Sequence, residues 1–226
     1  MELMDDGKTK AGYRIDEDTL RLAFKDDMTG SDGVFDPGAN EVSLSVEGAG
    51  KVNLAMSVYF FEKLEEHGIA THYIRANAED ATMTVHACEP FGHGLEVISR
   101  FKAVGSFYRR YSLYTEQGRD LDNYVEITVK DDKAGDPLIT EDALIELGIL
   151  EQDEYSELVR QTKRIAQIIR ELLAEKAIEL YDIKLEFGRD KSGGILLMDE
   201  ISSGNMRAYH NGRQLEPFEL HNRLLG

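Results

Sequence analysis

Alternating apolar and charged residues dominate the later part of this chain. Between Tyr181 and Phe187 the sequence alternates, and its charged members are Asp182, Lys184 and Glu186. On a strand the apolar set shares one face and packs on a core, while the charged set lines the opposite face. A second strand is predicted over residues 195–198, running into Asp199-Glu200. The segment 189–194 joins the two strands.

The same reading predicts the other elements. Further strands are expected over residues 13–15, 20–24, 81–88, 95–101 and 126–130. Apolar residues at helical spacing predict helices over 52–67 and 153–176, and the Asp- and Gly-rich stretch 26–40 predicts a loop. Strands first and mixed elements later are typical of an α+β protein. We expect a small β-rich N-terminal lobe, residues 1–88, and a larger α+β C-terminal lobe, residues 89–226.

Composition excludes several classes of protein. The chain has 226 residues, of which 42% are apolar and 31% charged, as expected for a folded soluble protein. Its formal net charge of -17 repels phosphate backbones, so we expect no nucleic-acid partner, and an anionic substrate would need a locally basic pocket. The single cysteine, Cys88, excludes an internal disulfide. No signal peptide or membrane span is predicted, so we expect a cytoplasmic protein without a membrane partner.

The charged face of the strand pair suggests a chemical role. Carboxylates on paired strands can hold Mg²⁺, which prefers hard oxygen ligands, and a neighbouring Lys can neutralise phosphate oxygens. Glu186 and Asp199 are our first choices as metal ligands, and Asp182 and Glu200 are the second choices. The pattern predicts an ATP-Mg²⁺ site. The alternative is a solvated strand face with ion pairs.

Positive charge is concentrated in one short segment of this acidic chain. It contains Arg100, Gly105, Ser106, Arg109 and Arg110. Arginine forks recognise phosphate, and Gly-Ser at a turn can add backbone and hydroxyl donors. The segment therefore predicts an anion site, with a basic surface turn as the alternative.

A second candidate phosphate site lies near the start of the chain. Lys8 and Lys10 follow Gly7, which allows close backbone approach to a phosphate, but the GKTK segment lacks the spacing of a Walker loop. From that segment alone they would more often be surface lysines.

Several motifs in a fixed order resemble the SAICAR synthetase family. They are GKTK at 7–10, DDMTGSDG at 26–33, GKVN at 50–53, EVISRFKAVGS at 96–106, KDDKAGDP at 130–137 and DIKLEFG at 182–188, followed by MDEIS at 198–202. Each motif is weak by itself, whereas their order and spacing are specific. The family consists of ATP-dependent ligases of purine synthesis. The resemblance implies a two-lobe fold with ATP bound between the lobes.

The resemblance also implies substrates and roles. It implies that ATP and Mg²⁺ are used to join CAIR (carboxyaminoimidazole ribonucleotide) to L-aspartate, giving SAICAR, ADP and phosphate. The expected partners are these small molecules, and a homodimer is an open possibility. The residues expected to bind ATP and metal are Lys8, Lys10, Lys130, Lys184, Glu186 and Asp199. Those expected to act in catalysis are Lys184, Asp182 and Lys130. Those expected to bind the substrate are Arg100, Gly105, Ser106, Arg110 and Arg207.

The chain departs from the family pattern on the substrate side. Ser203-Gly204 stands where the family has Pro-Asp, Tyr209 replaces a Trp, and Phe101 replaces the Asn after the motif's Arg. A Lys usually found two residues before Gly50 is also missing, and a long closing helix expected after residue 215 is absent from the sequence pattern. We expect Asn205 to orient the imidazole in place of the missing Asp. Three rivals remain: a paralogous ligase with other substrates, a small-molecule kinase, and a nucleotide-binding regulator without turnover.

Overall fold

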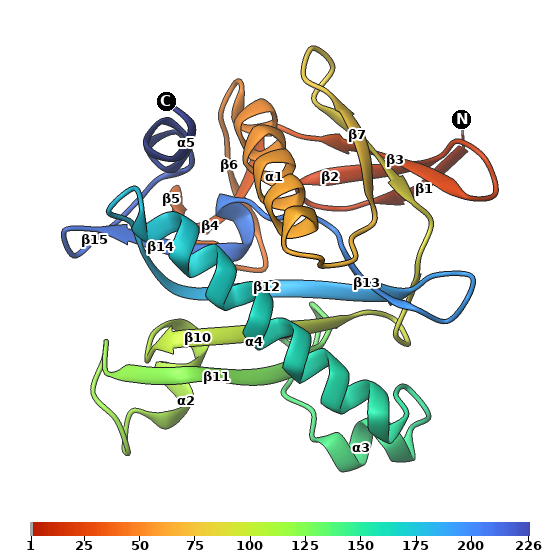
Figure 1. Cartoon of the computed structure of the whole chain (residues 1–226). Coiled ribbons are helices and arrows are strands. Elements are labelled where there is room, and N and C mark those ends of the chain that lie inside the picture. Colours follow the sequence, from red (N-terminus) through yellow and green to blue (C-terminus); the bar gives the residue numbers. More distant parts are fainter. Residues whose placement is uncertain (1) are drawn as a thin grey trace.

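The first sheet is formed by the N-terminal third of the chain. The computed structural model describes residues 2–226, and Figure 1 shows this sheet beside α1 (Ala49–Glu66). Its five strands follow the order β1-β2-β3-β8-β7 and pair antiparallel. Their bounds are Glu2–Asp6, Lys10–Arg14, Thr19–Phe24, Thr82–His86 and Tyr73–Asn77. A small three-stranded sheet of β4 (Asp27–Ser31), β5 (Val34–Phe35) and β6 (Val42–Ser45) leads into α1.

The second sheet has seven strands and positions the site. Its main path is β11-β10-β12-β14-β15, and the short strands β9 and β13 also pair with β12. The strands of the main path are β11 (Asp120–Val129), β10 (Leu95–Lys102), β12 (Glu179–Arg189), β14 (Met206–His210) and β15 (Arg213–Gln214). The two short strands are β9 (Glu89–Pro90) and β13 (Ile195–Met198). The long central strand β12 buries Ile183, Leu185 and Phe187, as its alternating sequence predicts.

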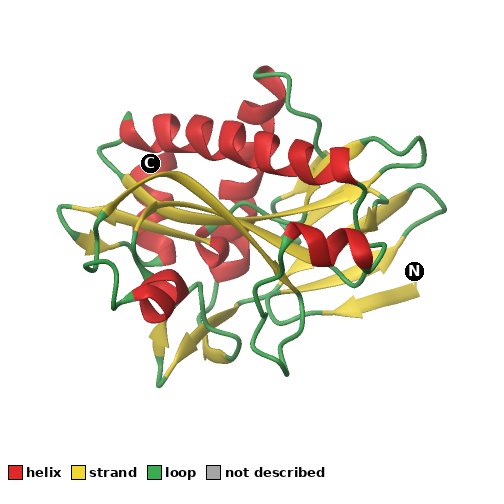
Figure 2. Ribbon diagram, turned by 90° about the horizontal axis from the view of Figure 1, so that it is seen from below, coloured by secondary structure: helices red, strands yellow, loops and turns green. Residues whose placement is uncertain are grey.

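The long helix α4 (Gln152–Ala174) covers one face of this sheet. It packs across β10, β11 and β12, as Figures 1 and 2 show. Its buried stripe includes Leu158, Ile165 and Ile169, and these belong to a core that also includes residues of the first sheet. The chain ends in α5 (Pro217–Leu225), which packs on α1. The remaining helices are α2 (Gly105–Tyr111), α3 (Glu141–Glu146) and the 3-10 turn η1 (Ser203–Asn205).

Two expectations about local structure were wrong. The stretch 26–40 is not only loop, because it contains β4 and β5. Asp32 and Gly33 have φ values of 52° and 76° and form the tight turn between these strands. Because the residues of the turn dominate the composition of this stretch, the sequence pattern did not predict the short strands on either side. Gly105 does not lie in a simple turn but begins α2, with a φ of 57° after the extended Val104.

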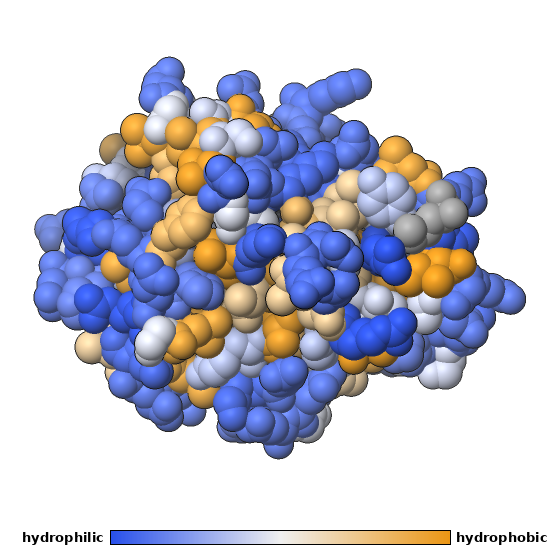
Figure 3. Space-filling view, turned by 90° about the horizontal axis from the view of Figure 1, so that it is seen from above, coloured by the Kyte–Doolittle hydropathy of each residue, from blue (hydrophilic) through white to orange (hydrophobic). Residues whose placement is uncertain are grey.

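The outer surface agrees with the acidic composition. On the face seen from above, hydrophilic side chains predominate and hydrophobic ones form small separate groups (Figure 3). Within residues 2–226, no helix is long and apolar enough to cross a membrane. The boundary proposed at residue 88 falls between His86, the last residue of β8, and Glu89, the first of β9.

Candidate active site

Charged side chains from adjacent strands line the face of the second sheet that the core does not use. On β12 these are Asp182, Lys184 and Glu186. Arg100 on β10 lies opposite Asp182 in the register, and Arg207 on β14 lies opposite Asp182 on its other side. Three neighbouring strands therefore bring residues about a hundred positions apart onto one surface.

Arg100 is the most buried charged residue of this surface, with 2% of its side chain exposed. Its Nη1 donates to Asp182 Oδ2 at 2.6 Å, its Nε donates to Glu126 Oε1 at 2.9 Å, and its Nη2 donates to Ser106 Oγ at 2.8 Å. The two carboxylates compensate the buried guanidinium, which would otherwise be costly to desolvate. The contact with Ser106 fixes the start of α2 beside the site.

Two further arginines, Arg110 and Arg207, contact this pair of carboxylates, and Arg109 lines the same cavity. Together with Arg100 and Ser106 we name these three the arginine cluster. Arg110 Nη2 donates to both oxygens of Glu126, at 2.6 and 2.7 Å. Arg207 donates from Nη1 to Asp182 Oδ2 at 2.9 Å and from Nη2 to Asp36 Oδ1 at 2.8 Å. Arg109 is exposed, and within residues 2–226 it has no hydrogen bond or ion pair. It is thus the cation of this group that is free to meet an anion.

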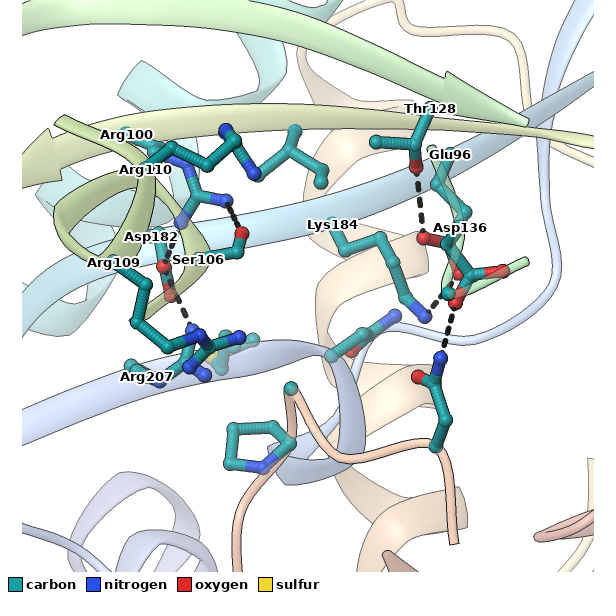
Figure 4. Close-up of a pocket in the computed structure, with 17 residues that line it drawn as sticks. Glu96, Arg100, Ser106, Arg109, Arg110, Thr128, Asp136, Asp182, Lys184 and Arg207 are labelled. Carbon is teal, nitrogen blue, oxygen red and sulfur yellow. Dashed lines mark hydrogen bonds and ion pairs between the residues drawn. The ribbon is translucent and has the colours of Figure 1, made fainter. Parts of the chain in front are cut away.

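A cavity lies between the arginine cluster and Lys184. Figure 4 shows the arginines and Ser106 at one end, and Lys184, Glu96 and Asp136 at the other. Lys184 Nζ donates to Glu96 Oε1 at 2.6 Å, and Glu96 Oε2 accepts from Thr128 Oγ1 at 3.1 Å. Burial opposes the charged amine, yet Glu96 and Glu186 together raise the pKa of Lys184 above its usual value. Lys184 is therefore a cation in the wall of the cavity.

A second group of charges lies next to Lys184, and we name it the lysine–carboxylate cluster: Lys10, Lys130, Glu186, Asp199 and Glu200. Lys130 Nζ donates to both oxygens of Glu186 at 3.0 Å. Lys10 Nζ lies 3.3 Å from Asp199 Oδ2 and also forms an ion pair with Glu200. The cluster joins β2 of the first sheet to β12 and β13 of the second, which places it between the two sheets.

The electrostatics of the lysine–carboxylate cluster are set by burial and by opposing charges. Burial and the carboxylate of Asp199 raise the pKa of Glu186. Burial opposes ionisation of Asp199 as well, but Lys10 and Lys130 lower its pKa overall. Burial also lowers the pKa of both lysines, but neighbouring carboxylates outweigh it. Asp199 and Glu200 raise the pKa of Lys10, and Glu186 raises the pKa of Lys130. The two lysines are held as cations and at least one carboxylate as an anion.

The donor set of this cluster fits Mg²⁺ bound together with a phosphate. Glu186 and Asp199 supply hard carboxylate oxygens, and Mg²⁺ characteristically takes one or two carboxylates and completes its shell with phosphates and water. No group of three or more metal-binding side chains occurs in the part of the chain that the structure describes. The cluster therefore does not resemble a closed structural metal site.

The backbone at Asp199 is held in an unusual conformation. Its φ is 69°, a region that non-glycine residues rarely adopt. The ring Nε2 of buried His72 lies 3.0 Å from the Asp199 carbonyl oxygen and can donate to it. Because burial lowers the pKa of His72 to about 4, the ring is neutral at neutral pH. His72 thus steadies the Asp199 backbone without adding a charge.

Two other expected site residues, Lys8 and Asn205, have partners within the protein. Lys8 contacts Asp132 at 2.6 Å and ties the Gly7–Lys10 segment to the loop after β11, on the rim of the lysine–carboxylate cluster. Asn205 lines the cavity, but its amide is used internally: Nδ2 donates to the Glu200 carbonyl and Oδ1 accepts from Ser202 N. Asn205 therefore caps η1, and these contacts use one N–H and one oxygen lone pair of its amide.

Sequence reasoning missed several members of the site. Glu96 and Glu126 partner Lys184 and the arginines, yet neither was expected to be a site residue. On the predicted strands Glu96 shares a face with Arg100, and Glu126 shares a face with Thr128 and Lys130, and this period of two was a usable signal. Asp36 contacts Arg207 and Asn40 lines the cavity, and both come from a loop that carries no periodic pattern of its own.

Comparison with known proteins gives a consistent result. Residues 3–219 match the model of the SAICAR synthetase family. A phosphoribosylaminoimidazole-succinocarboxamide synthase from Clostridium tetani is 53% identical and covers 97% of both chains. One from Methanocaldococcus jannaschii is 35% identical, over 90% of this chain and 79% of the relative.

Solved structures agree with the sequence relatives. A SAICAR synthetase (Type-2) in complex with ADP has a TM-score of 0.84 and 32% identity, over 98% of this chain and 97% of that chain. A Type-1 structure of SAICAR synthetase from Pyrococcus horikoshii has a TM-score of 0.82 and 31% identity, over 95% of this chain and 96% of that chain. The α+β, two-lobe fold expected from the sequence is thereby confirmed.

Proposed function

The chain belongs to the SAICAR synthetase family, and we propose that its two polar clusters divide the ligase reaction between them. It is an ATP-dependent ligase of purine biosynthesis. The reaction joins the carboxylate of CAIR to the amine of L-aspartate, with SAICAR, ADP and phosphate as products. The proposal concerns which residues carry each half of this reaction.

The lysine–carboxylate cluster is the proposed site of the ATP phosphates. Lys10 and Lys130 are held as cations by their neighbours, so they can neutralise phosphate oxygens without a change of protonation. Glu186 and Asp199 would hold Mg²⁺, which would screen the charge of the transferred phosphoryl group. An ATP site here also agrees with the structural relative that is in complex with ADP.

The cavity beside this cluster is the proposed site of the phosphorylated carboxylate. Arg109 is exposed and unpartnered within residues 2–226, and it stands at the arginine end with the Ser106 hydroxyl. We propose that the substrate phosphate binds there. The carboxylate then extends toward Lys184, which lies two residues from Glu186 on the same strand face.

Lys184 is the residue proposed to serve both halves of the reaction. A carboxylate oxygen of CAIR attacks the γ-phosphorus, the bond to ADP breaks, and an acyl phosphate forms. The amine of aspartate then attacks the acyl carbon, a proton leaves the nitrogen, and phosphate departs. Lys184 and Lys130 would stabilise the charge that develops on the phosphoryl oxygens. Asp182 acts by holding Arg100 and Arg207 in place.

The observation that carries this proposal is the position of Lys184, between the cavity that holds the free Arg109 and the cluster that holds Glu186. The test is product analysis with ATP and Mg²⁺, supplying CAIR and aspartate separately and together. Amide product, ADP and phosphate should form in equal amounts only when both are present. A folded protein that binds ATP and makes no amide would instead support a ligase for another pair of substrates.

The location and assembly of the protein are part of the proposal. Its phosphorylated substrates and its single cysteine support a cytoplasmic location. The family resemblance leaves room for a homodimer, and light scattering on the purified chain, with and without ATP, would measure its mass in solution.

A further inference from the structure

Arg207 forms ion pairs with two carboxylates that differ in their exposure to solvent. Its own side chain is 12% exposed; Asp182 is 5% exposed and Asp36 is 41% exposed. Asp182 also serves Arg100 and is fixed within the sheet. Asp36 comes from the loop between β5 and β6, so it is the partner that can leave.

Close packing shows that this contact is built into the loop. A Cβ atom added at Gly38 would lie 2.1 Å from Nη2 of Arg207, and one added at Gly105 would lie 2.8 Å from Nη1. A side chain at position 38 would force the guanidinium of Arg207 or the loop to move. The backbone N–H of Gly38 in turn donates to Asp36 Oδ1 at 2.9 Å, which aims the carboxylate at Arg207.

The same loop is tied to the far side of the cavity. Asn40 Nδ2 donates to Asp136 Oδ2 at 2.7 Å, a contact drawn as a dashed line in Figure 4. Pro37, Gly38 and Asn40 line the cavity. The loop therefore lies along the cavity and touches the second sheet's Arg207 at one point and the segment after β11 at another.

We propose that Asp36 is an internal competitor for Arg207 and sets the affinity of the cavity for a phosphate monoester. The ligand exchanges with the Asp36 carboxylate: Arg207 transfers one N–H donor from Asp36 to a phosphate oxygen, and the bound phosphate then has both Arg109 and Arg207. The exchange lowers the net affinity, because the contact with Asp36 must be given up first. This inference rests on the proposed function, since it assumes that the arginine cluster receives a phosphate.

The experiment measures binding of ribose 5-phosphate by calorimetry at pH 7.5, with ribose as the ligand that lacks the phosphate. Asp36→Asn keeps the acceptor for Gly38 N–H and removes the charge. Gly38→Ala keeps the charge and forces the loop and the Arg207 guanidinium apart. Both variants should bind ribose 5-phosphate about three- to fivefold more tightly, the range of a partly exposed ion pair. Asp32→Asn, an equal substitution in the exposed turn of the same region, should match the wild type.

The direction of the effect decides the inference. A residue that merely supports the cavity would weaken binding when changed, so unchanged or weaker binding in folded Asp36→Asn and Gly38→Ala overturns the competitor role. Arg207→Gln added to Asp36→Asn should abolish the gain, and a gain that persists would place it elsewhere and also overturn the inference. Because no turnover is needed, tighter binding can be observed even if CAIR and aspartate give no amide, and a failure here leaves the amide assay unaffected.

Discussion

Lys184 and Glu96 form an ion pair of 2.6 Å across neighbouring strands, where the cavity meets the lysine–carboxylate cluster. The contact holds the lysine in the cavity wall while leaving a third of its side chain exposed. In the proposed reaction, a cation at this position would contact the carboxylate end of the bound substrate on one side and the phosphoryl group on the other. The first prediction concerns the cluster next to this pair.

Glu186→Gln is expected to weaken Mg²⁺-dependent ATP binding by roughly tenfold or more, since a hydrogen bond to a charged group is worth about 1.5–3 kcal/mol. Calorimetry with ATP in Mg²⁺ and in EDTA measures the change. Glu179→Gln provides the control, because Glu179 lies on the same strand and is exposed. Equal affinities of Glu186→Gln and wild type in Mg²⁺ would remove Glu186 from the metal site.

Arg109→Gln is expected to raise the KM for CAIR about tenfold and to leave the KM for ATP within about twofold. The reason is that a free guanidinium on a phosphate forms a charge-assisted contact of about 1.5–3 kcal/mol. Steady-state kinetics with each substrate varied in turn separates the two effects. Arg119→Gln is the matched control, because the Arg119 side chain is also exposed and has no hydrogen bond or ion pair within residues 2–226. A parallel rise in both KM values would indicate a structural effect of Arg109.

Arg100 is expected to act mainly on stability. Arg100→Met removes the most buried cation from two buried carboxylates, which then keep only Arg110 and Arg207, and breaking a buried ion pair costs about 3–5 kcal/mol. Urea unfolding should show that loss, whereas Arg160→Met on the exposed face of α4 should change little. Arg100→Lys should fall between the two and raise the KM for CAIR, because a lysine keeps the charge but loses the fork. A stable Arg100→Met protein would contradict the compensating role of the two carboxylates.

His72 gives a prediction of pH dependence. Its folded pKa of about 4 lies below the usual value of 6.5, so between these values the unfolded chain binds a proton that the folded chain does not. The free energy of unfolding therefore falls as the pH drops through this window, by up to about 3 kcal/mol in total. The free energy of unfolding of His72→Gln should depend less steeply on pH between pH 4 and 6.5, and the variant His93→Gln, at an exposed histidine, should follow wild type. Identical slopes for His72→Gln and wild type would contradict this assignment.

The sequence predicts elements where one period runs long enough. Strand β12 was found because its charged and apolar residues alternate without a break, and α4 because its apolar stripe extends over several turns. Helix α2 was missed because it has only 7 residues and starts at a glycine, and α5 because its 9 residues form only about two and a half turns. Local periodicity carries little signal in such short elements.

Site residues could also be predicted where a local sequence pattern contains them, and not where tertiary packing brings them together. Lys184, Glu186 and Asp199 could be placed together because one strand and its hairpin partner contain them. Asp36 reaches Arg207 across 171 positions, from a loop whose course depends on tertiary packing. The ion pairs that neutralise Arg100 could not be foreseen either, since they depend on the register of β10 against β11 and β12.

The altered segment after Ile201 supports a last prediction. Restoring the family pattern with Ser203→Pro and Gly204→Asp is expected to preserve activity with CAIR and aspartate. A Cβ atom at position 204 would lie 3.5 Å from Ser202 Oγ and 3.8 Å from Glu200 Oε1, so the backbone has room for a side chain. The new carboxylate would, however, approach Glu200, which already shares Lys10 with Asp199.

Two single changes separate the causes in that variant. Ser203 Oγ donates to Asn53 Oδ1 at 2.7 Å, and Ser203→Ala removes this bond without changing position 204. We expect Ser203→Ala to lower stability by about 1 kcal/mol and to leave kcat/KM for CAIR close to wild type. The double variant should show the same stability loss, and the KM for ATP should rise modestly because of the added negative charge near Lys10. If the double variant binds ATP normally but no longer converts CAIR, the pocket depends on the open space at Gly204, and restoring the family residue has filled room that the substrate uses.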